Sequence, residues 1–295
     1  AYDIYNENTG ILNINNIEIS GGVLYPVVNE GKDKISEENT IYSAIIKNSN
    51  ISRSTSASTY GIINSGDGTM LIETSTINTY HENSNKASGK LIIRDSTLLS
   101  QQLYNNKDGE IEIENSTIQY LRNYSNGKIV IKGKDSNLKT ITNSNKDGTV
   151  EMLDGKVSYN GTAIENYGKL SIYGGTVEGI GNNYSAGIYN RSTGVTTIRG
   201  ENTTITGSGY GIDNQGTAIV ESGVIKGTLA YGIRNSKDLT LGIKDGTIAT
   251  KPTVYGKTNG IYNTGTFNFY DGIIEGNESS SITGKIPSET EDDCT

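Results

Sequence analysis

The clearest pattern along the chain is a frame of apolar positions that alternate with polar ones and recur at a regular spacing. Three segments of 17 residues show it best: AIENYGKLSIYGGTVEG at 163–179, GIDNQGTAIVESGVIKG at 211–227 and GIYNTGTFNFYDGIIEG at 260–276. In each segment apolar residues take the second, eighth, tenth and fifteenth places. Such short alternation predicts β-strands, and its repetition predicts a stacked solenoid rather than one globular core.

Each segment also carries an asparagine in fourth place, which marks the register of the repeat. Marks of this kind stand at Asn6, Asn29, Asn48, Asn64, Asn83, Asn105, Asn123, Asn143, Asn166, Asn190, Asn214, Asn235 and Asn263. Their mean spacing of about 21 residues suits one coil of a three-sided β-helix. We expect this asparagine to bend the chain in the left-handed conformation, and a second corner to use Gly175, Gly223 and Gly272. Stacked in register, six of the side chains are predicted to form a hydrogen-bonded ladder: Asn143, Asn166, Asn190, Asn214, Asn235 and Asn263.

These features predict an all-β fold, a single-stranded right-handed parallel β-helix (β-solenoid) of about 12–13 coils. We expect it to cover residues 1–276, with irregular coils over 1–59 and regular coils over 60–276. The polar, acidic segment 277–295 drops the repeat and is predicted to be a C-terminal cap or a linker tail. In each coil the second-place isoleucine should be buried and the third-place residue exposed.

Composition and charge narrow the class of function. The net charge of −8 argues against a nucleic-acid partner, because phosphates would repel this surface. No apolar run is long enough for membrane insertion. The single cysteine, Cys294, lies in the tail, so disulfides are not expected to stabilise the fold. The chain begins within a coil-like segment without a signal peptide, and we expect a monomeric part of a longer protein.

Residues that could carry chemistry are sparse. The one histidine, His81, has no second histidine or cysteine near it in sequence, so no metal site and no cofactor are predicted. The glycine-rich segment GSGYG at 207–211 lacks the lysine of a phosphate-binding loop. Glu165 and Asp213 should lie about 9.6 Å apart, two coils from each other, near the upper limit for an inverting glycosidase pair. No further acidic residues cluster beside them, and no catalytic residue is assigned.

The third place of successive coils forms an outward column on one sheet. In the C-terminal half it alternates charged and aromatic residues, and we assign it as the candidate ligand-binding site: Glu165, Tyr189, Asp213, Arg234 and Tyr262. Aromatic rings on a rigid sheet can stack on sugar faces or anchor a protein. The alternative is a solvated sheet in which tyrosine simply reflects its high strand propensity.

The segment GIYNTGTFNFYDGIIEG resembles the repeats of large surface proteins of Gram-positive and other bacteria. These are similar to the right-handed parallel β-helix superfamily, which includes pectate lyases, phage tailspikes and solenoid adhesins. The resemblance implies an extracellular adhesin at the cell surface or cell wall that binds a host or environmental glycan or a surface protein. The alternatives are a β-helical polysaccharide lyase or glycoside hydrolase, and a tailspike-like trimeric receptor-binding protein. The catalytic carboxylate clusters of the polysaccharide-degrading members have no match here, so we expect a protein that is not an enzyme.

Overall fold

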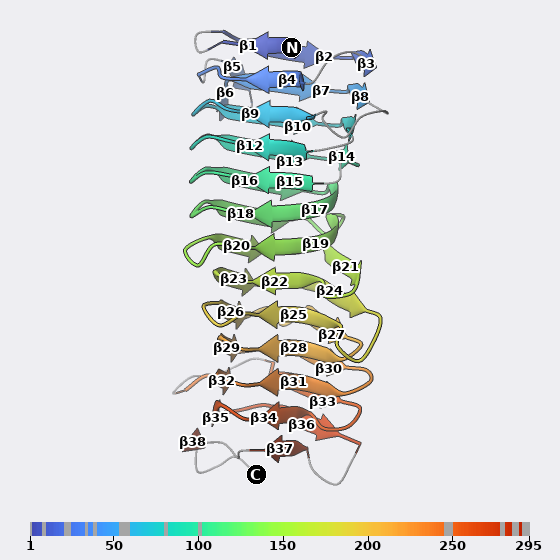
Figure 1. Cartoon of the computed structure of the whole chain (residues 1–295), viewed down its shortest axis with the longest axis vertical. Coiled ribbons are helices and arrows are strands. Elements are labelled where there is room, and N and C mark those ends of the chain that lie inside the picture. Colours follow the sequence, from blue (N-terminus) through green and yellow to red (C-terminus); the bar gives the residue numbers. More distant parts are fainter. Residues whose placement is uncertain are drawn as a thin grey trace. The chain divides into compact units, whose positions relative to one another are not determined.

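The computed structural model describes residues 2–7, 10–20, 25–32, 35–37, 40–52, 60–79, 82–99, 102–244, 250–277, 281–284 and 289–290. The secondary-structure elements assigned among these residues are all β-strands, and nearly all of them pair in parallel with the strand one coil away (Figure 1). The all-β parallel β-helix predicted from the repeat is therefore confirmed. The chain divides into two compact units, residues 1–138 with 147–149, and residues 139–146 with 150–295.

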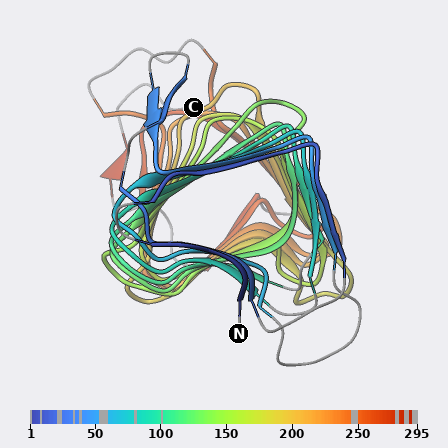
Figure 2. The ribbon, with the colours of Figure 1, turned by 90° about the horizontal axis from the view of Figure 1, so that it is seen from above.

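In the first unit each coil contributes up to three strands, and the chain turns around a central interior (Figure 2). Buried apolar side chains fill this interior. The first side is built of β1 (Tyr2–Asn6), β4 (Tyr25–Asn29), β9 (Ile62–Asn64), β12 (Glu82–Asn85) and β15 (Gln102–Asn105). The second side is built of β2 (Leu12–Asn15), β7 (Ala44–Lys47), β10 (Thr69–Glu73), β13 (Lys90–Arg94), β16 (Glu110–Glu114) and β18 (Lys128–Lys132). The third side is built of β3 (Glu18–Ser20), β8 (Asn50–Ser52), β11 (Thr76–Asn78) and β14 (Thr97–Leu98).

Two elements of this unit depart from the simple coil. Strand β17 (Thr117–Asn123) runs through a corner, so that its start pairs with β14 and its end with β15. Strands β5 (Ile35–Glu37) and β6 (Thr40–Tyr42) form an antiparallel pair, the one exception to parallel pairing among the described strands. The irregularity expected over residues 1–59 thus includes a hairpin inserted between β4 and β7.

The second unit repeats the three-sided coil with closer regularity. Its first side holds the end of β19 (Asn137–Asn143), then β22 (Ile164–Asn166), β25 (Ala186–Asn190), β28 (Tyr210–Asn214), β31 (Tyr231–Asn235), β34 (Ile261–Asn263) and β37 (Ile282–Gly284). Its second side holds β20 (Thr149–Met152), β23 (Lys169–Ile172), β26 (Val195–Ile198), β29 (Thr217–Val220), β32 (Asp238–Leu241), β35 (Thr266–Phe269) and β38 (Glu289–Thr290). Its third side holds β21 (Lys156–Asn160), β24 (Gly175–Ile180), β27 (Thr203–Gly207), β30 (Val224–Gly227), β33 (Thr253–Gly256) and β36 (Ile273–Gly276).

The core consists of the apolar places of the repeat. The second-place isoleucines Ile164, Ile212 and Ile261 are fully buried, as predicted. The last coil is the exception, because Phe269 and Ile274 are only partly buried and Ile273 is 46% exposed. The described residues beyond β36 form only the short strands β37 and β38, which pair with β34 and β35 and give β36 no following strand.

The asparagines form a side-chain ladder inside each unit. In the second unit the Nδ2 group of each asparagine donates to Oδ1 of the next, over 2.7–3.0 Å: Asn143, Asn166, Asn190, Asn214, Asn235 and Asn263. In the first unit the same bonds, of 2.7–3.3 Å, join Asn6, Asn29, Asn64, Asn85, Asn105 and Asn123. All of these side chains are buried, so each ladder satisfies polar groups that water does not reach.

Two predicted register marks are wrong. The ladder passes through Asn85 instead of Asn83, because Asn83 pairs with Leu103 and therefore occupies a place that is apolar in the next coil. Asn48 lies at another corner, where it adopts a left-handed φ of 48°.

The predicted backbone role of the ladder asparagines is also wrong. The left-handed residues of the first unit form a separate column after the second side: Asn16, Asn48, Thr74, Asp95, Asn115 and Gly133. The ladder asparagines end extended strands and bend the chain through side-chain bonds, as when Asn214 Oδ1 accepts from the Gly216 amide at 3.2 Å. Gly175, Gly223 and Gly272 do have positive φ, as predicted for the second corner.

Candidate functional site

The first side of the second unit brings the five predicted site residues into one column. Pairing between β22, β25, β28, β31 and β34 sets them side by side in the order Glu165, Tyr189, Asp213, Arg234 and Tyr262. Each stands between a buried isoleucine and a buried ladder asparagine, so strand alternation directs it away from the core.

Arg234 and Asp213 form a bidentate ion pair across neighbouring coils. Arg234 Nε donates to Asp213 Oδ1 at 2.9 Å, and Nη2 donates to Oδ2. The hydrogen bonds that Arg234 donates to this carboxylate raise the pKa of the arginine. The guanidinium also lies 4.3 Å from the centre of the Tyr210 ring and donates to the Tyr210 hydroxyl at 3.2 Å. Arginine packs in this way because its planar cation can stack and form paired bonds together.

Asp213 does not have the exposure predicted for a third-place residue. Its relative exposure is 5%, because Arg234 covers it from the next coil. A buried carboxylate held by two charge-assisted bonds is costly to unpair. Asp213 therefore belongs to the framework of the surface and positions Arg234.

A second arginine, Arg191, is arranged in the same way two coils before Arg234, next to the column. It follows the ladder residue Asn190, and its Nε donates to Glu165 Oε1 at 2.7 Å. Its guanidinium lies 3.8 Å from the centre of the Tyr189 ring and donates to that hydroxyl at 2.9 Å. Partial burial lowers the pKa of Arg191, but the bond and charge of Glu165 outweigh burial, so the pKa is raised.

Tyr167 completes this cluster. Its hydroxyl donates to Glu165 Oε1 at 3.2 Å, and burial together with the negative charge of Glu165 raises its pKa. Sequence reasoning missed both Tyr167 and Arg191. They occupy the fifth place of their coils, directly after the ladder asparagine, so a second outward column was visible in the repeat.

Three tyrosines stack beside the arginine of the later coils. The ring centres of Tyr210 and Tyr231 are 6.0 Å apart with 13° between planes, and those of Tyr231 and Tyr262 are 5.1 Å apart with 18° between planes. Tyr210 is buried, whereas Tyr231 and Tyr262 keep part of their surface in solvent. The loop between β24 and β25 adds Tyr184, which is 76% exposed and next to Ser185, whose carbonyl accepts from the amides of Gly209 and Tyr210.

We refer to six side chains together as the tyrosine–arginine surface: Tyr189, Arg191, Tyr210, Tyr231, Arg234 and Tyr262. It combines the partly exposed rings of Tyr189, Tyr231 and Tyr262 with fixed guanidinium groups, and such a combination is suited to aromatic contact and hydrogen bonding with a ligand. Two carboxylates lie next to this surface: Glu165 is bonded to Arg191, and Asp213 is bonded to Arg234.

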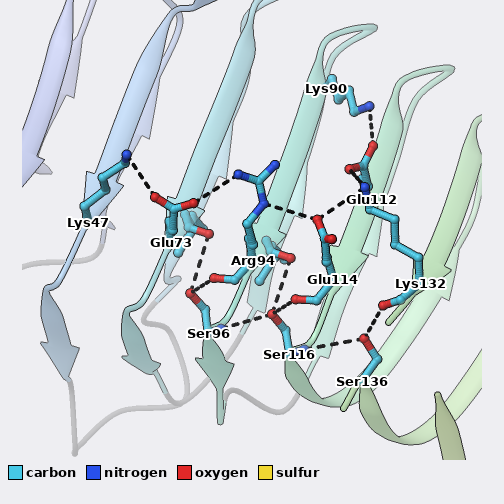
Figure 3. A network of polar contacts seen from close by, with 12 residues as sticks. Lys47, Glu73, Lys90, Arg94, Ser96, Glu112, Glu114, Ser116, Lys132 and Ser136 are labelled. Carbon is cyan, nitrogen blue, oxygen red and sulfur yellow. Dashed lines mark hydrogen bonds and ion pairs between the residues drawn. The ribbon is translucent and has the colours of Figure 1, made fainter. Parts of the chain in front are cut away.

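The first unit carries a different polar network on its second side (Figure 3). Charged side chains alternate in sign across β7, β10, β13, β16 and β18, and salt bridges connect Lys47, Glu73, Arg94, Glu114, Lys132, Glu112, Lys90 and Glu110. Next to it runs a row of serines, in which the backbone amide of each serine donates a hydrogen bond to the hydroxyl of the serine in the next coil. The row consists of Ser49, Ser75, Ser96, Ser116 and Ser136. Because charges and hydroxyls are matched within the network, we interpret it as a structural counterpart of the asparagine ladder.

Sequence analysis missed this network, although a motif marks it. A charged residue, a turn residue and Ser-Thr recur as ETST at 73–76, RDST at 94–97 and ENST at 114–117. The second residue of each motif adopts the left-handed conformation, and the serine hydroxyl donates to the carbonyl two residues earlier at 2.7–2.8 Å.

Two features were looked for in the described part of the chain: a cluster of metal-ligating side chains and a membrane-spanning helix. No three histidine, cysteine, aspartate or glutamate residues in the ranges given above lie close enough to hold a metal ion. His81 and Cys294 lie outside the described residues. Nor does any described residue belong to a helix with the length and apolar character needed to cross a bilayer.

Comparison with known proteins finds no relative. No protein-family model matches the chain, and searches of curated proteins and of solved structures find no match.

Proposed function

We propose that this chain is a ligand-binding module of an extracellular bacterial surface protein, an adhesin, and that it holds an extended saccharide on the tyrosine–arginine surface. The observation that carries the proposal is the stack of Tyr210, Tyr231 and Tyr262 beside Arg234. Sugar rings present apolar faces that stack on tyrosine, and their hydroxyl groups accept hydrogen bonds from arginine.

The rigidity of the surface supports this proposal. Arg234 is held by Asp213, and Arg191 by Glu165, so neither guanidinium must be ordered when the ligand arrives. Preorganised side chains lower the entropy cost of binding. The parallel strands also repeat the surface at about 4.8 Å, a spacing that lets an extended chain meet several coils.

Placement at the cell surface and membership of the pectate-lyase-like β-helix superfamily rest on the resemblance of the repeat. A host or environmental surface protein is the other class of ligand that the rings could anchor, and the test below separates the two. Within the second unit, Glu165 and Asp213 are engaged by arginines, and the proposal gives them a positioning role.

The test is a glycan array followed by titration calorimetry with the best saccharide. Each lost stacking contact costs about 0.5–1.5 kcal/mol, so the pair Tyr231→Ala and Tyr262→Ala should weaken binding on the order of 10-fold or more. Tyr173→Ala is the matched control, because Tyr173 is 41% exposed and follows β23 on the second side. Circular dichroism would verify that all variants stay folded.

Three outcomes would contradict the proposal. Undiminished binding in the paired variant would place the site elsewhere. Binding to a protein but to no saccharide would select the protein ligand. Release of reducing or unsaturated ends from a polysaccharide, abolished by Glu165→Gln, would instead indicate an enzyme.

A further inference from the structure

Each arginine of the tyrosine–arginine surface is paired with its own carboxylate. Arg191 forms an ion pair with Glu165, and Arg234 forms one with Asp213. Each pair holds one charge of each sign within hydrogen-bond distance, so the field of the carboxylate offsets that of the guanidinium. The surface therefore has two guanidinium groups and no net charge from them.

The two guanidinium groups still have hydrogen-bond donors to offer. In each arginine Nε and Nη2 point to the carboxylate, and Nη1 donates to a tyrosine hydroxyl, that of Tyr189 for Arg191 and that of Tyr210 for Arg234. A guanidinium has five N–H groups, so one on Nη1 and one on Nη2 bond to no described residue. The arginine side chains keep 33% and 34% of their surface in solvent, so a ligand can reach them.

The outer tyrosines add hydrogen-bonding capacity without adding charge. Tyr231 and Tyr262 are partly exposed, and their hydroxyls bond to no residue that the structure describes. A phenol both donates and accepts a hydrogen bond and is uncharged at neutral pH. These two groups therefore match the hydroxyls of a ligand and not an ionic group.

Charges around the surface do not restore a positive field. Lys237 comes close to Arg191, because its Nζ donates to the carbonyl of Ser192 at 3.0 Å, but the exposed Asp238 directly follows this lysine. The whole chain has a net charge of −8. A polyanion would be repelled by the chain as a whole, and at the surface it would meet arginines that are already paired.

We propose that the tyrosine–arginine surface selects a neutral saccharide over an acidic one, and that Glu165 and Asp213 set this preference. The inference rests on the proposed function, because it names the class of saccharide that the same surface binds. The hydroxyls of a neutral sugar can accept from the remaining N–H groups and exchange hydrogen bonds with the phenols. A uronic acid would have to give up the hydration of its carboxylate without gaining an unpaired cation.

The experiment presents the full chain to an array of neutral and acidic glycans that includes matched pairs. Three suitable pairs are cellohexaose with its uronate counterpart, mannohexaose with hexamannuronate, and galactohexaose with hexagalacturonate. Calorimetry on the pair with the strongest signal should show the neutral member binding about 10-fold or more tightly. Its affinity should change less than about 2-fold between about 0.05 M and about 0.5 M sodium chloride, because no net charge is paired on binding.

Two variants test the role of the carboxylates. Glu165→Gln keeps the shape of the side chain and leaves the Arg191 charge without its partner, so the preference for the neutral member should fall about 5-fold or more through tighter binding of the acidic one. That gain should disappear at high salt. Asp213→Asn should act in the same way through Arg234, with circular dichroism to verify folding because Asp213 is buried.

The matched control is Glu221→Gln. It removes the partner of Arg199 in an ion pair of the same kind, at the ends of β26 and β29 on the second side, and should leave the preference unchanged. Tighter binding of the acidic member by the unaltered chain, or an unchanged preference in folded Glu165→Gln, would overturn this inference and leave the proposed function standing. Absence of binding to every saccharide on the array would overturn both.

Discussion

Removing one rung of the second unit's ladder should have a large effect for a single polar side chain. Asn214 is fully buried in β28, where its Oδ1 accepts from Asn190 at 2.8 Å and from the Gly216 amide at 3.2 Å. Its Nδ2 lies 2.7 Å from Asn235 Oδ1, 2.8 Å from the Asp238 carbonyl and 3.1 Å from that of Gly216. Asn214→Ala deletes all of these contacts at once.

The magnitude follows from what remains buried without a partner. After the substitution Asn190 keeps its bonds to the carbonyls of Gly194 and Thr217, so that rung stays satisfied. Asn235 Oδ1 and the amide of Gly216 lose their donor and acceptor, respectively. Each buried group left unpaired costs about 1–3 kcal/mol, so the two groups together give a loss of about 2–6 kcal/mol in the free energy of unfolding.

Urea denaturation followed by circular dichroism would measure the loss, and amide hydrogen exchange would show whether it is confined to the second unit. Asn160→Ala is the matched control, because Asn160 ends β21 with an exposed side chain and should change stability by less than about 0.5 kcal/mol. If Asn214→Ala cost less than about 1 kcal/mol, or no more than the control, water would be able to replace the rung and the ladder would not stabilise the coils.

Further changes test the packing between coils and the charged network. A Cβ at Gly216 would lie 2.3 Å from the Gly194 carbonyl oxygen, so Gly216→Ala should destabilise the second unit by at least about 2 kcal/mol, measurable as a fall in urea midpoint. In the first unit, partial burial raises the pKa of Glu73 and Glu112, but bonds and charges from neighbouring lysines and arginine outweigh it, so both pKa values are lowered. A lowered folded-state pKa stabilises the protein above the unfolded value of 4.5, and this contribution is lost as the pH falls through the folded-state pKa. Denaturation between about pH 5 and pH 3 should therefore show a falling urea midpoint, and Glu112→Gln should flatten that fall while costing about 1 kcal/mol at neutral pH. An unchanged pH profile in Glu112→Gln would contradict the assigned role of the network.

The sequence alone predicted the coil and much of its interior. Ile164, Ile212 and Ile261 recur in a fixed frame with their asparagines, so repetition identified buried places that a single coil could not. The prediction failed where a coil breaks its own pattern. Asn83 and Asn85 are two residues apart, so both point to the same face of the strand. Asn83 occupies the place that Leu103 takes in the next coil, and because it is polar the sequence did not show which asparagine belongs to the ladder.

The candidate surface was predicted less completely, for a physical reason. Alternation indicates the face of the strand from which a side chain projects. Its exposure to solvent also depends on side chains of the next coil, as Arg234 shows by covering Asp213. The bond between Arg191 and Glu165 joins residues 26 apart in sequence and depends on how two coils align after the corner. Such contacts require the register of neighbouring coils, which the pattern of one coil does not contain.

The ladders also have a consequence for the order in which the chain can fold. Their rungs join residues separated by only 18–35 positions, and each new rung is built on the one before it within the same unit. Short sequence separation keeps the entropy cost of closing each coil low. A nascent chain can therefore add coils one at a time in the order of synthesis, each using the exposed edge of the previous coil as a template. Within a unit, the slow step is expected to be the formation of the first paired coils, and growth after it should be fast.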